Sequence, residues 1–600
     1  MTIRYAIRPA DPGAHVFHVT VAIDDPDPEG QSFLLPAWVP GSYMIRDFAR
    51  HIVRLRALDG SGRRVRVVKT DKHTWRCAPL ARGTGVTLAY EVYANDLSVR
   101  AAHLDTTRGF FNASSVFLLP RGREGQACRV EILAPPASPA VRDWRVATAL
   151  EPTAGTRRGR FGAYRCASYE ELVDSPVEMG TFRSARFAVL GVEHEIAIGG
   201  AVARLDIDRL AADLARVCTA HARMFEPRRR RLPFDRYLFL AMAVDDGHGG
   251  LEHRKSSALL CSRDDLPFLG SKSRPEGYRR FLGLASHEYF HAWNVKRIRP
   301  AVFRDLDLAR ENYTPLLWLF EGFTSYYDDL ALCRAGLITP QQYLQSLGET
   351  VTAVLQRSGR LKQTLAESSF DAWIKYYKAD ENAPNSIVSY YQKGALVAAA
   401  LDLSIRRRSA GRRSLDDVMR LLWRRFLQEG ADYAGLAPED VAPAIEEATG
   451  IDLSRPLREW TQSTADPDLA ALLEPLGVRV QRVPALDSPT FALLGCRMGN
   501  AAEGRIGQVF DGSPAQRAGL SAGDQLVALD GLRAAGPRLD RLLARCLPGD
   551  RVEVLAFRRE QLLRFAVKLA SRPPEKWLLD VDPQAAAAAR RLRAGWLGAG

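Results

Sequence analysis

His287-Glu288-Tyr289-Phe290-His291 places two histidines four residues apart, with a glutamate directly after the first. On an α-helix this spacing brings both imidazoles onto one face, where they can share a single divalent ion. The glutamate then stands close enough to act on a metal-bound water. The flanking residues favour a helix from Tyr278 to Trp293, and Pro300 limits how far it can extend. This pattern is typical of a zinc hydrolase.

A third metal ligand is expected, because catalytic zinc takes three protein ligands and keeps one position for water. Glu321 is the one carboxylate in the apolar helical stretch Pro315-Leu-Leu-Trp-Leu-Phe-Glu321-Gly-Phe. A buried carboxylate is costly unless it is paired or bound to a metal. The sequence therefore predicts Glu321 as the third ligand, with a core glutamate paired to an arginine as the alternative.

Asp328 follows Glu321 by almost two helical turns and so shares its face. From there it is placed to accept the free imidazole N–H of a ligand histidine and fix the tautomer of that ring. An ordinary solvent-facing aspartate fits the sequence equally well.

Several motifs occur in the order found in the gluzincin aminopeptidases, the group that includes aminopeptidase N. They are Gly249-Gly-Leu-Glu252-His, His287-Glu-Tyr-Phe-His291, Phe320-Glu321-Gly-Phe-Thr and Tyr391-Gln-Lys-Gly-Ala395. The chain most resembles the glycyl aminopeptidase family with an appended PDZ domain, and Trp38-Val-Pro-Gly-Ser-Tyr-Met-Ile-Arg-Asp47-Phe resembles that family too. The interval from His291 to Glu321 is longer than in aminopeptidase N, so we expect a loop inserted around residues 302–313 beside the site.

The resemblance implies two roles in substrate binding and catalysis. Glu252, beside Gly249 and Gly250 at the end of a predicted strand, would hold the free α-ammonium of the substrate. Tyr391 would stabilise the oxyanion of the tetrahedral intermediate. The alternatives are a surface ion pair of Glu252 with a neighbouring basic residue, Arg254 or Lys255, and a packed aromatic role for Tyr391.

The predicted mechanism follows from these residues. One zinc ion held by His287, His291 and Glu321 would lower the pKa of its water, and Glu288 would take the proton and pass it to the leaving amine. The predicted function is a zinc aminopeptidase that removes small amino-terminal residues, Gly or Ala, from peptides. The alternatives are a zinc endopeptidase and a PDZ-bearing scaffold protein with a vestigial metal site.

The length of 600 residues exceeds what one core normally holds, so we predict a multidomain α+β protein. Short alternating strands such as His18–Ile23 and Val86–Val92 predict a β-sandwich-like domain over residues 1–175. Longer helical patterns, among them Leu316–Ala335 and Leu415–Glu429, predict a thermolysin-like catalytic domain with a helical part over residues 176–466. The remaining predictions are a linker at 467–489, a PDZ domain at 490–572 centred on the stretch Gly507–Gly531, and a tail at 573–600, in which Pro583–Trp596 is either an Ala/Arg helix or frayed.

Charge and cysteine content limit which partners and which cellular compartment are expected for this protein. The chain has 83 basic and 70 acidic residues, a formal charge of +13 that is scattered apart from Arg228–Arg231. Without an aromatic-interleaved basic stripe, no nucleic-acid partner is expected.

The 8 cysteines are widely spaced and are expected to be free thiols. With no signal-peptide pattern or long apolar run, we expect a cytoplasmic enzyme with no membrane partner. Its partners would be peptides with a free amino terminus. The PDZ domain would either bind a peptide carboxyl terminus or only pack on the catalytic body.

Overall fold

The computed structural model describes residues 2–228 and 231–598, so Arg229 and Arg230 of the basic run lie outside the described residues. The chain divides into two compact units. One comprises Met1–Asn312, Tyr327–Leu337 and Leu422–Leu436, and the other comprises Tyr313–Tyr326, Ile338–Leu421 and Ala437–Gly600. The predicted multidomain α+β architecture, with a β-rich amino-terminal part and a helical catalytic region, is confirmed.

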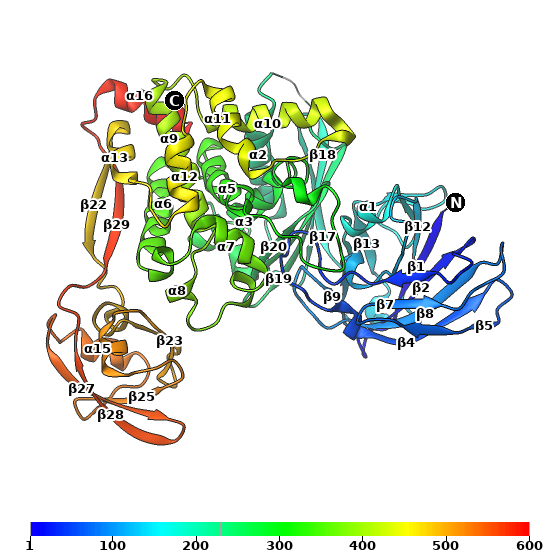
Figure 1. The fold of residues 1–600 in the computed structure, drawn as a ribbon, viewed down its shortest axis with the longest axis horizontal. Helices are drawn as coiled ribbons and strands as arrows, with labels where there is room; N and C mark the ends of the chain where they lie inside the picture. Colours follow the sequence, from blue (N-terminus) through cyan, green and yellow to red (C-terminus); the bar gives the residue numbers. More distant parts are fainter. Residues whose placement is uncertain (1, 229–230, 599–600) are drawn as a thin grey trace. The chain divides into compact units, whose positions relative to one another are not determined.

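The amino-terminal part of the first unit is built on an eight-stranded sheet (Figure 1). Its strands lie in the order β14 (Glu151–Pro152), β15 (Gly162–Cys166), β12 (Cys128–Ile132), β1 (Ile3–Asp11), β2 (Val16–Ile23), β8 (Val86–Tyr93), β4 (Ile52–Asp59) and β5 (Arg64–Val65). Strands β1, β2 and β8 alternate buried and more exposed residues along their length. This period of two directs one side chain in two into the core.

Two four-stranded sheets complete this part. One has the order β13 (Arg145–Thr148), β16 (Val177–Gly180), β10 (Arg108–Phe111) and β9 (Ala102–Leu104), and the other has the order β11 (Leu119–Pro120), β3 (Ser32–Leu34), β7 (Thr74–Cys77) and β6 (Val67–Lys69).

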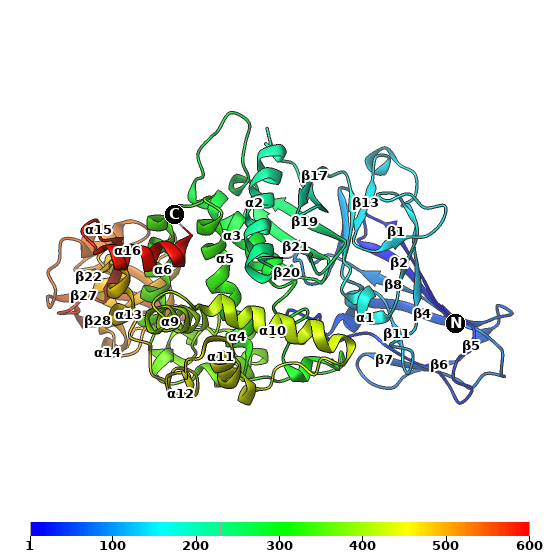
Figure 2. The same cartoon turned by 90° about the horizontal axis from the view of Figure 1, so that it is seen from above.

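A five-stranded sheet with the order β17-β18-β19-β21-β20 follows in the same unit. Its central strand β19 (Arg236–Val244) pairs in parallel with β18 (Val192–Gly199) and with β21 (Ser256–Ser262). β19 is an almost continuous apolar run, as expected for a strand covered on both faces. Helices α2 (Ile207–Phe225) and α3 (Glu276–Phe290) contact each other and this sheet (Figure 2). The sheet thus supports the helix that carries the paired histidines.

Two histidines of this layer are buried as neutral rings. In β18, the Nδ1–H of His194 donates to the Val192 carbonyl, and its Nε2 accepts from the Tyr289 hydroxyl, both at 3.0 Å. His221 of α2 lies 2.7 Å from the Ser286 hydroxyl through its Nε2. Burial lowers the pKa of His194 to about 4 and that of His221 to about 3.

These rings predict an acid-induced loss of stability that begins near neutrality. Below pH 6.5, the ordinary histidine pKa, the unfolded state binds protons that the buried rings do not. The free energy of unfolding should therefore fall by about 1.4 kcal/mol per histidine for each pH unit, down to the folded pKa values. His194→Gln and His221→Gln should each flatten the dependence of the melting temperature on pH between 6.5 and 5. The exposed His18→Gln is the control, and an unchanged slope in both buried-site variants would contradict the prediction.

The second unit contains the helical region. Helix α6 (Pro340–Leu355) begins at a Thr339 capping box, and α9 (Gln392–Arg408) packs against it. All but three residues of α9 are buried, which agrees with the unbroken run of apolar and small residues over 394–401. Helix α5 (Gly322–Arg334) begins in this unit and ends in the first unit.

The segments predicted as linker and tail form regular elements of the second unit. The linker interpretation of 467–489 is therefore corrected, while the helix considered for Pro583–Trp596 lies at Ala587–Leu597. The two segments form α13 (Leu469–Leu473), β22 (Val478–Pro484), β29 (Glu575–Val581) and α16 (Ala587–Leu597). β22 and β29 pair in an antiparallel ladder over their whole lengths (Figure 1). β29 also contacts α6, where the Trp577 N–H donates to the Thr352 hydroxyl at 2.9 Å. This pairing joins segments far apart in the sequence, so local periodicity could not reveal it.

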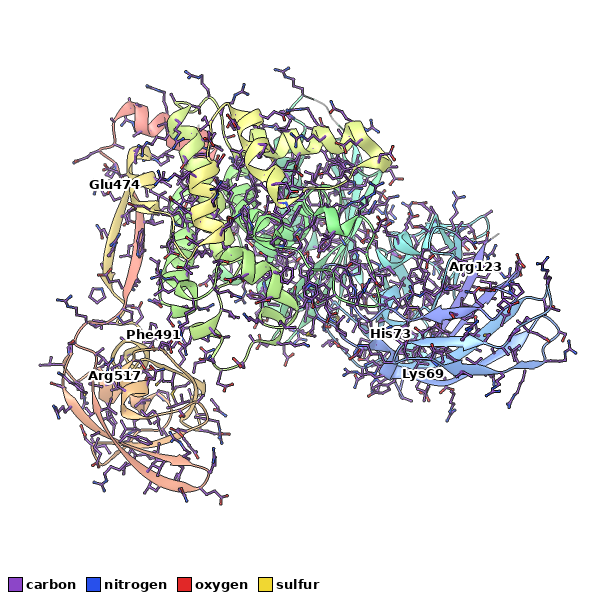
Figure 3. All side chains as sticks on the ribbon, in the orientation of Figure 1. Lys69, His73, Arg123, Glu474, Phe491 and Arg517 are labelled. Carbon is purple, nitrogen blue, oxygen red and sulfur yellow. The ribbon has the colours of Figure 1, made fainter. Side chains whose placement is uncertain are left out.

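A six-stranded sheet lies between β22 and β29 along the chain, with its own apolar core. Phe491, labelled in Figure 3, lies in the helical turn Thr490–Leu494 that precedes this sheet along the chain. Its ring packs edge-on against Phe510, with ring centroids 4.9 Å apart. Polar contacts join this part of the chain to the helical region of the same unit, and the Asp511 N–H donates to Asn385 Oδ1 at 2.9 Å. Asn385 Nδ2 donates to the Val509 carbonyl at 2.8 Å, Ser358 donates to Asp511 at 3.0 Å, and Lys362 forms an ion pair with Asp511.

Candidate metal centre

Helix α3 carries the two histidines and the glutamate between them. It ends at Phe290, earlier than predicted, and His291 is its C-cap residue with helical backbone angles. The two imidazole rings therefore still lie close, with centroids 4.8 Å apart. Glu288 is buried, with 5% of its surface exposed.

Each histidine has a partner for its Nδ1 atom. His287 Nδ1 lies 3.0 Å from a carboxylate oxygen of Asp328, and His291 Nδ1 lies 2.8 Å from the Asn294 carbonyl. Both acceptors require an N–H at Nδ1, so each ring carries its lone pair at Nε2, the atom available to a metal. Burial raises the pKa of Asp328, while its hydrogen bond from His287 acts in the opposite direction. Of the two roles considered for Asp328, this geometry favours that of the histidine partner.

Glu321 occupies a break between two helices. The predicted continuous helix from Leu316 to Ala335 is divided into α4 (Leu317–Phe320) and α5, and Glu321 is the C-cap residue of α4. It is 2% exposed. A Cβ on Gly322 would lie 2.5 Å from Gly394 of α9, so the two helices touch through their glycines. This contact accounts for the glycine that directly follows Glu321 and for the glycine three residues after Tyr391.

Two overlapping groups of side chains present ligand atoms within 4.8 Å of one another. One is His287, His291 and Glu321, and the other is Glu252, Glu288 and His291. Two imidazoles and one carboxylate form a donor set that suits catalytic zinc. The residues present thus fit the metal that the sequence predicts.

Strand β20 (His248–Glu252) forms the edge of the five-stranded sheet, next to α3. Gly249 and Gly250 lie within this strand, and the missing side chain at Gly250 leaves space for a neighbouring residue. A Cβ on Gly250 would lie 1.9 Å from a carboxylate oxygen of Glu288. On the opposite side, a Cβ on Gly41 would lie 2.4 Å from a carboxylate oxygen of Glu252, and Gly41 has φ +99°. Each of the two carboxylates therefore lies against a glycine, and a larger residue at either position would displace it.

Glu252 is 4% exposed and does not pair with the neighbours considered from the sequence. Arg254 binds Glu170 at 2.8 Å, and Lys255 lies 3.7 Å from Asp235. The nearby cation is Lys296, whose Nζ lies 4.0 Å from Glu252.

Lys296 and Asp174 are site residues that the sequence reasoning missed. The Lys296 ammonium lies 3.1 Å from Asp174, the C-cap residue of α1 (Tyr169–Val173). Burial alone would lower the pKa of Lys296, but the charges of Asp174 and Glu252 more than offset it and raise that pKa. Burial acts to raise the pKa of Asp174, yet the charge of Lys296 leaves it well below its ordinary value. The only signal in the sequence was a lysine five residues after His291, which is too common a feature to single out.

Tyr391 directly precedes α9 in the second unit. Burial raises the pKa of its hydroxyl well above the ordinary value, and the charge of Glu321 raises it further. The hydroxyl is therefore a proton donor at any physiological pH. The neighbouring Tyr390 is completely buried.

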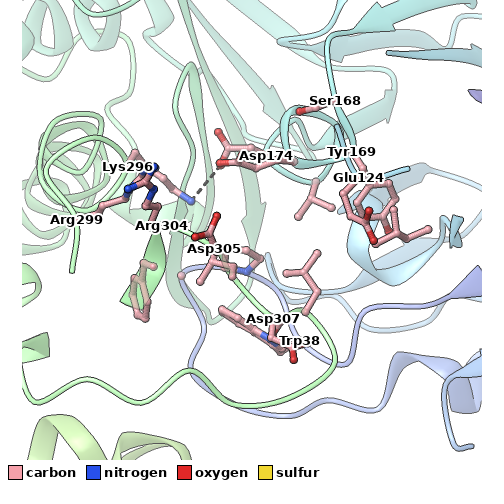
Figure 4. Close-up of a pocket in the computed structure, with 18 of the residues that line it drawn as sticks. Trp38, Glu124, Ser168, Tyr169, Asp174, Lys296, Arg299, Arg304, Asp305 and Asp307 are labelled. Carbon is pink, nitrogen blue, oxygen red and sulfur yellow. Dashed lines mark hydrogen bonds and ion pairs between the residues drawn. The ribbon is translucent and has the colours of Figure 1, made fainter. Parts of the chain in front are cut away.

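A cavity of about 610 Å³ in the first unit opens beside Glu252 (Figure 4). Its walls include Trp38, Asp174, Lys296 and residues of the predicted insertion. This insertion contacts the amino-terminal part through two hydrogen bonds, from the Trp38 indole to the Asp307 carbonyl at 2.9 Å and from the Ala37 N–H to the Leu308 carbonyl at 2.7 Å. The motif around Trp38 and the insertion thus shape one cavity.

Comparison with known proteins gives consistent results. Residues 4–181 match the peptidase M61 N-terminal domain, and residues 280–397 match the M61 glycyl aminopeptidase model. An aminopeptidase N family protein from Idiomarina loihiensis is 37% identical, with 99% of this chain and 100% of that chain covered and a TM-score of 0.93. An M1 zinc metallopeptidase from Deinococcus radiodurans is 14% identical, with 78% and 95% covered and a TM-score of 0.48. The search of curated proteins gives no match.

All 8 cysteines are free thiols. In the described ranges 2–228 and 231–598, no helix combines the length and apolar character needed to cross a bilayer.

Proposed function

Because the chain is a zinc metallo-aminopeptidase of the M61 glycyl aminopeptidase family, we propose that it releases Gly or Ala from the amino termini of peptides. One observation carries the aminopeptidase mode at this site: atoms of Glu252 lie within 4.8 Å of atoms of Glu288 and His291. The α-nitrogen and carbonyl carbon of one residue are only about 2.5 Å apart. A carboxylate at this distance suits a substrate whose free ammonium and scissile carbonyl belong to the same residue. The preference for Gly or Ala rests on the family.

We assign one zinc ion to His287, His291 and Glu321, with Asp328 orienting His287. Zinc would polarise the substrate carbonyl and acidify a water at this site. Glu288 would accept the proton of the attacking water at its carboxylate and deliver it to the leaving amine. Gly250 would leave the space that Glu288 needs, since the Cβ of any larger residue would occupy the position of the Glu288 carboxylate.

The test of this function is a substrate profile with and without a chelator. We expect glycyl and alanyl reporter substrates to be cleaved, leucyl substrates to be cleaved poorly, and N-acetyl-glycyl substrates to be rejected, because they lack the charge that pairs with Glu252. Glu252→Gln should reduce the preference for a free amine by at least about tenfold in kcat/KM. The exposed Glu193→Gln serves as the control. Equal kcat/KM for glycyl, leucyl and N-acetyl-glycyl substrates would favour an endopeptidase.

Tyr391→Phe should lower kcat by about 10²- to 10³-fold with little change in KM, because the hydroxyl is proposed to donate to the oxyanion in the transition state. Single-turnover rates on a glycyl substrate would measure this effect. Tyr377→Phe is a matched control, since its hydroxyl lies 3.4 Å from that of Tyr391. Wild-type rates in Tyr391→Phe would remove this residue from the mechanism.

We also propose that residues 490–572 form a PDZ domain that docks on the helical region. The contacts of Asp511 with Ser358 and Lys362 support docking. The start of this region is held to its own helix α15 (Arg538–Leu543), because Thr490 donates to Asp540 through both its N–H, at 2.9 Å, and its hydroxyl, at 2.7 Å. The free thiols agree with the proposed cytoplasmic location.

A further inference from the structure

We propose that Lys296 and Asp174 form a positioning pair that leaves the substrate site with a single uncompensated carboxylate, so that Glu252 binds one ammonium group in one place. This inference deepens the proposed function and rests on the assignment of the substrate amine to Glu252. Its starting point is that a buried cation, Lys296, lies beside Glu252, the carboxylate that has to bind the ammonium group of the substrate.

The geometry of the pair determines how its charges are shared. The Lys296 ammonium lies 3.1 Å from Asp174 but 4.0 Å from Glu252 (Figure 4 labels the lysine and Asp174). All three side chains are largely buried, with 9%, 12% and 5% of their surfaces exposed for Lys296, Asp174 and Glu252. Asp174 therefore neutralises the lysine, and Glu252 keeps its charge for the substrate.

Asp174 is itself held in place by its neighbours. One of its carboxylate oxygens accepts from the backbone N–H of Arg254 at 2.7 Å, and the other lies 3.4 Å from the His253 ring. The Arg254 side chain is directed to Glu170 and so leaves Asp174 to the lysine. Glu252, His253 and Arg254 are consecutive, so the segment that supplies the amine-binding carboxylate also anchors the counterion of Lys296.

A strained turn places Lys296. Val295 has φ +96°, a conformation that is rare for a β-branched residue. The residue before it, Asn294, offers its carbonyl to His291, and the residue after it is the lysine. Backbone bonds hold the turn, from Val295 N–H to the Ile298 carbonyl at 2.7 Å and from Lys296 N–H to the His291 carbonyl at 3.2 Å. Strain of this kind is retained where the surrounding structure requires it, often at functional sites. One turn thus orients the metal-ligand histidine and sets the lysine between the two carboxylates.

The test measures peptide binding in a zinc-loaded chain that carries Glu288→Gln to prevent hydrolysis. Triglycine and N-acetyl-triglycine are titrated by calorimetry. Asp174→Asn should weaken triglycine binding by at least about tenfold, because the freed lysine then pairs with Glu252. Lys296→Met should bind triglycine at least as tightly as the parent. The double variant Asp174→Asn/Lys296→Met should return to within about threefold of the parent, because removing one charge of each sign restores the net charge. N-acetyl-triglycine binding should not follow this pattern.

A purely structural role predicts a different result. The losses of triglycine affinity caused by the two single substitutions would then add, and the double variant would bind triglycine no better than Asp174→Asn does. In a chain with Glu288 restored, Lys296→Met should lower kcat without raising KM. Without the lysine, Asp174 and Glu252 would share the substrate ammonium, which would displace the substrate from its position for reaction. Glu178→Gln is the control for disturbing a buried ion pair of the same unit, because Glu178 binds Arg108 at 2.7 Å. Melting temperatures report folding, and the double variant removes both partners of the pair, which is the least disruptive change.

Two outcomes would overturn the inference: triglycine affinity unchanged in Asp174→Asn, or a double variant as weak as the single one. The proposed function fails in a distinguishable way. In that case the parent itself would bind triglycine and N-acetyl-triglycine equally, and Glu252→Gln would change neither.

Discussion

Glu288→Gln is expected to keep its zinc and its fold while kcat falls by about 10³- to 10⁴-fold, because an amide cannot accept the proton of the attacking water. The amide has nearly the shape of the carboxylate, so it fits the space that Gly250 leaves open. Zinc content by mass spectrometry and rates on a glycyl substrate would measure the two properties separately.

The exposed Glu276→Gln in the first turn of α3 is the matched control, since it removes the same charge from the same helix. Turnover in Glu288→Gln within tenfold of wild type would assign the general base to another residue. A loss of zinc along with activity would instead indicate that Glu288 supports the metal.

Glu321→Ala is expected to lose zinc, with affinity falling by more than about 10²-fold and activity lost with the metal, because two histidines alone do not complete the three-ligand set. Asp328→Asn provides a comparison in which a smaller loss of zinc affinity is expected. Asp328 contacts His287 without being a proposed ligand, so its loss should lower zinc affinity by only about 10- to 100-fold. Zinc retained after dialysis would be measured for both variants.

Glu349→Ala, an exposed glutamate of α6 in the same unit, is the control for Glu321→Ala. Full zinc occupancy and activity in Glu321→Ala would refute the ligand assignment. Added zinc should restore activity to Asp328→Asn at concentrations that leave Glu321→Ala inactive, because only the latter lacks a donor.

Local sequence was sufficient for the elements with strong periodicity. The strands His18–Ile23 and Val86–Val92 lie within β2 and β8, and the helix predicted over Leu415–Glu429 has those ends in the structure. The ordered aminopeptidase motifs identified the family, which the comparisons confirm. The assignments of individual catalytic and metal-binding residues remain predictions for the experiments above.

Other parts of the fold depended on contacts that no local pattern contains. The β22–β29 ladder joins segments predicted as linker and tail. The two strands lie far apart in the sequence, so the pattern of either segment alone does not reveal their pairing. The helix over Leu316–Ala335 is divided at Glu321, where Gly322 and Gly394 bring two backbones together. Helix propensity alone cannot predict that break, because tertiary packing causes it.

The sequence by itself determined which chemical groups this protein brings to its site: two histidines on one helix face, a glutamate between them, and a carboxylate in an apolar stretch. These follow from short-range spacing, which the helix converts directly into geometry. Only the tertiary structure decided how the charge of Glu252 is balanced. Asp174, Glu252 and Lys296 come from three separate segments, and their ion pairs form only when the fold brings those segments together in a buried place. Because the energy of such pairs depends on distance and burial, spacing along the chain carries no trace of it.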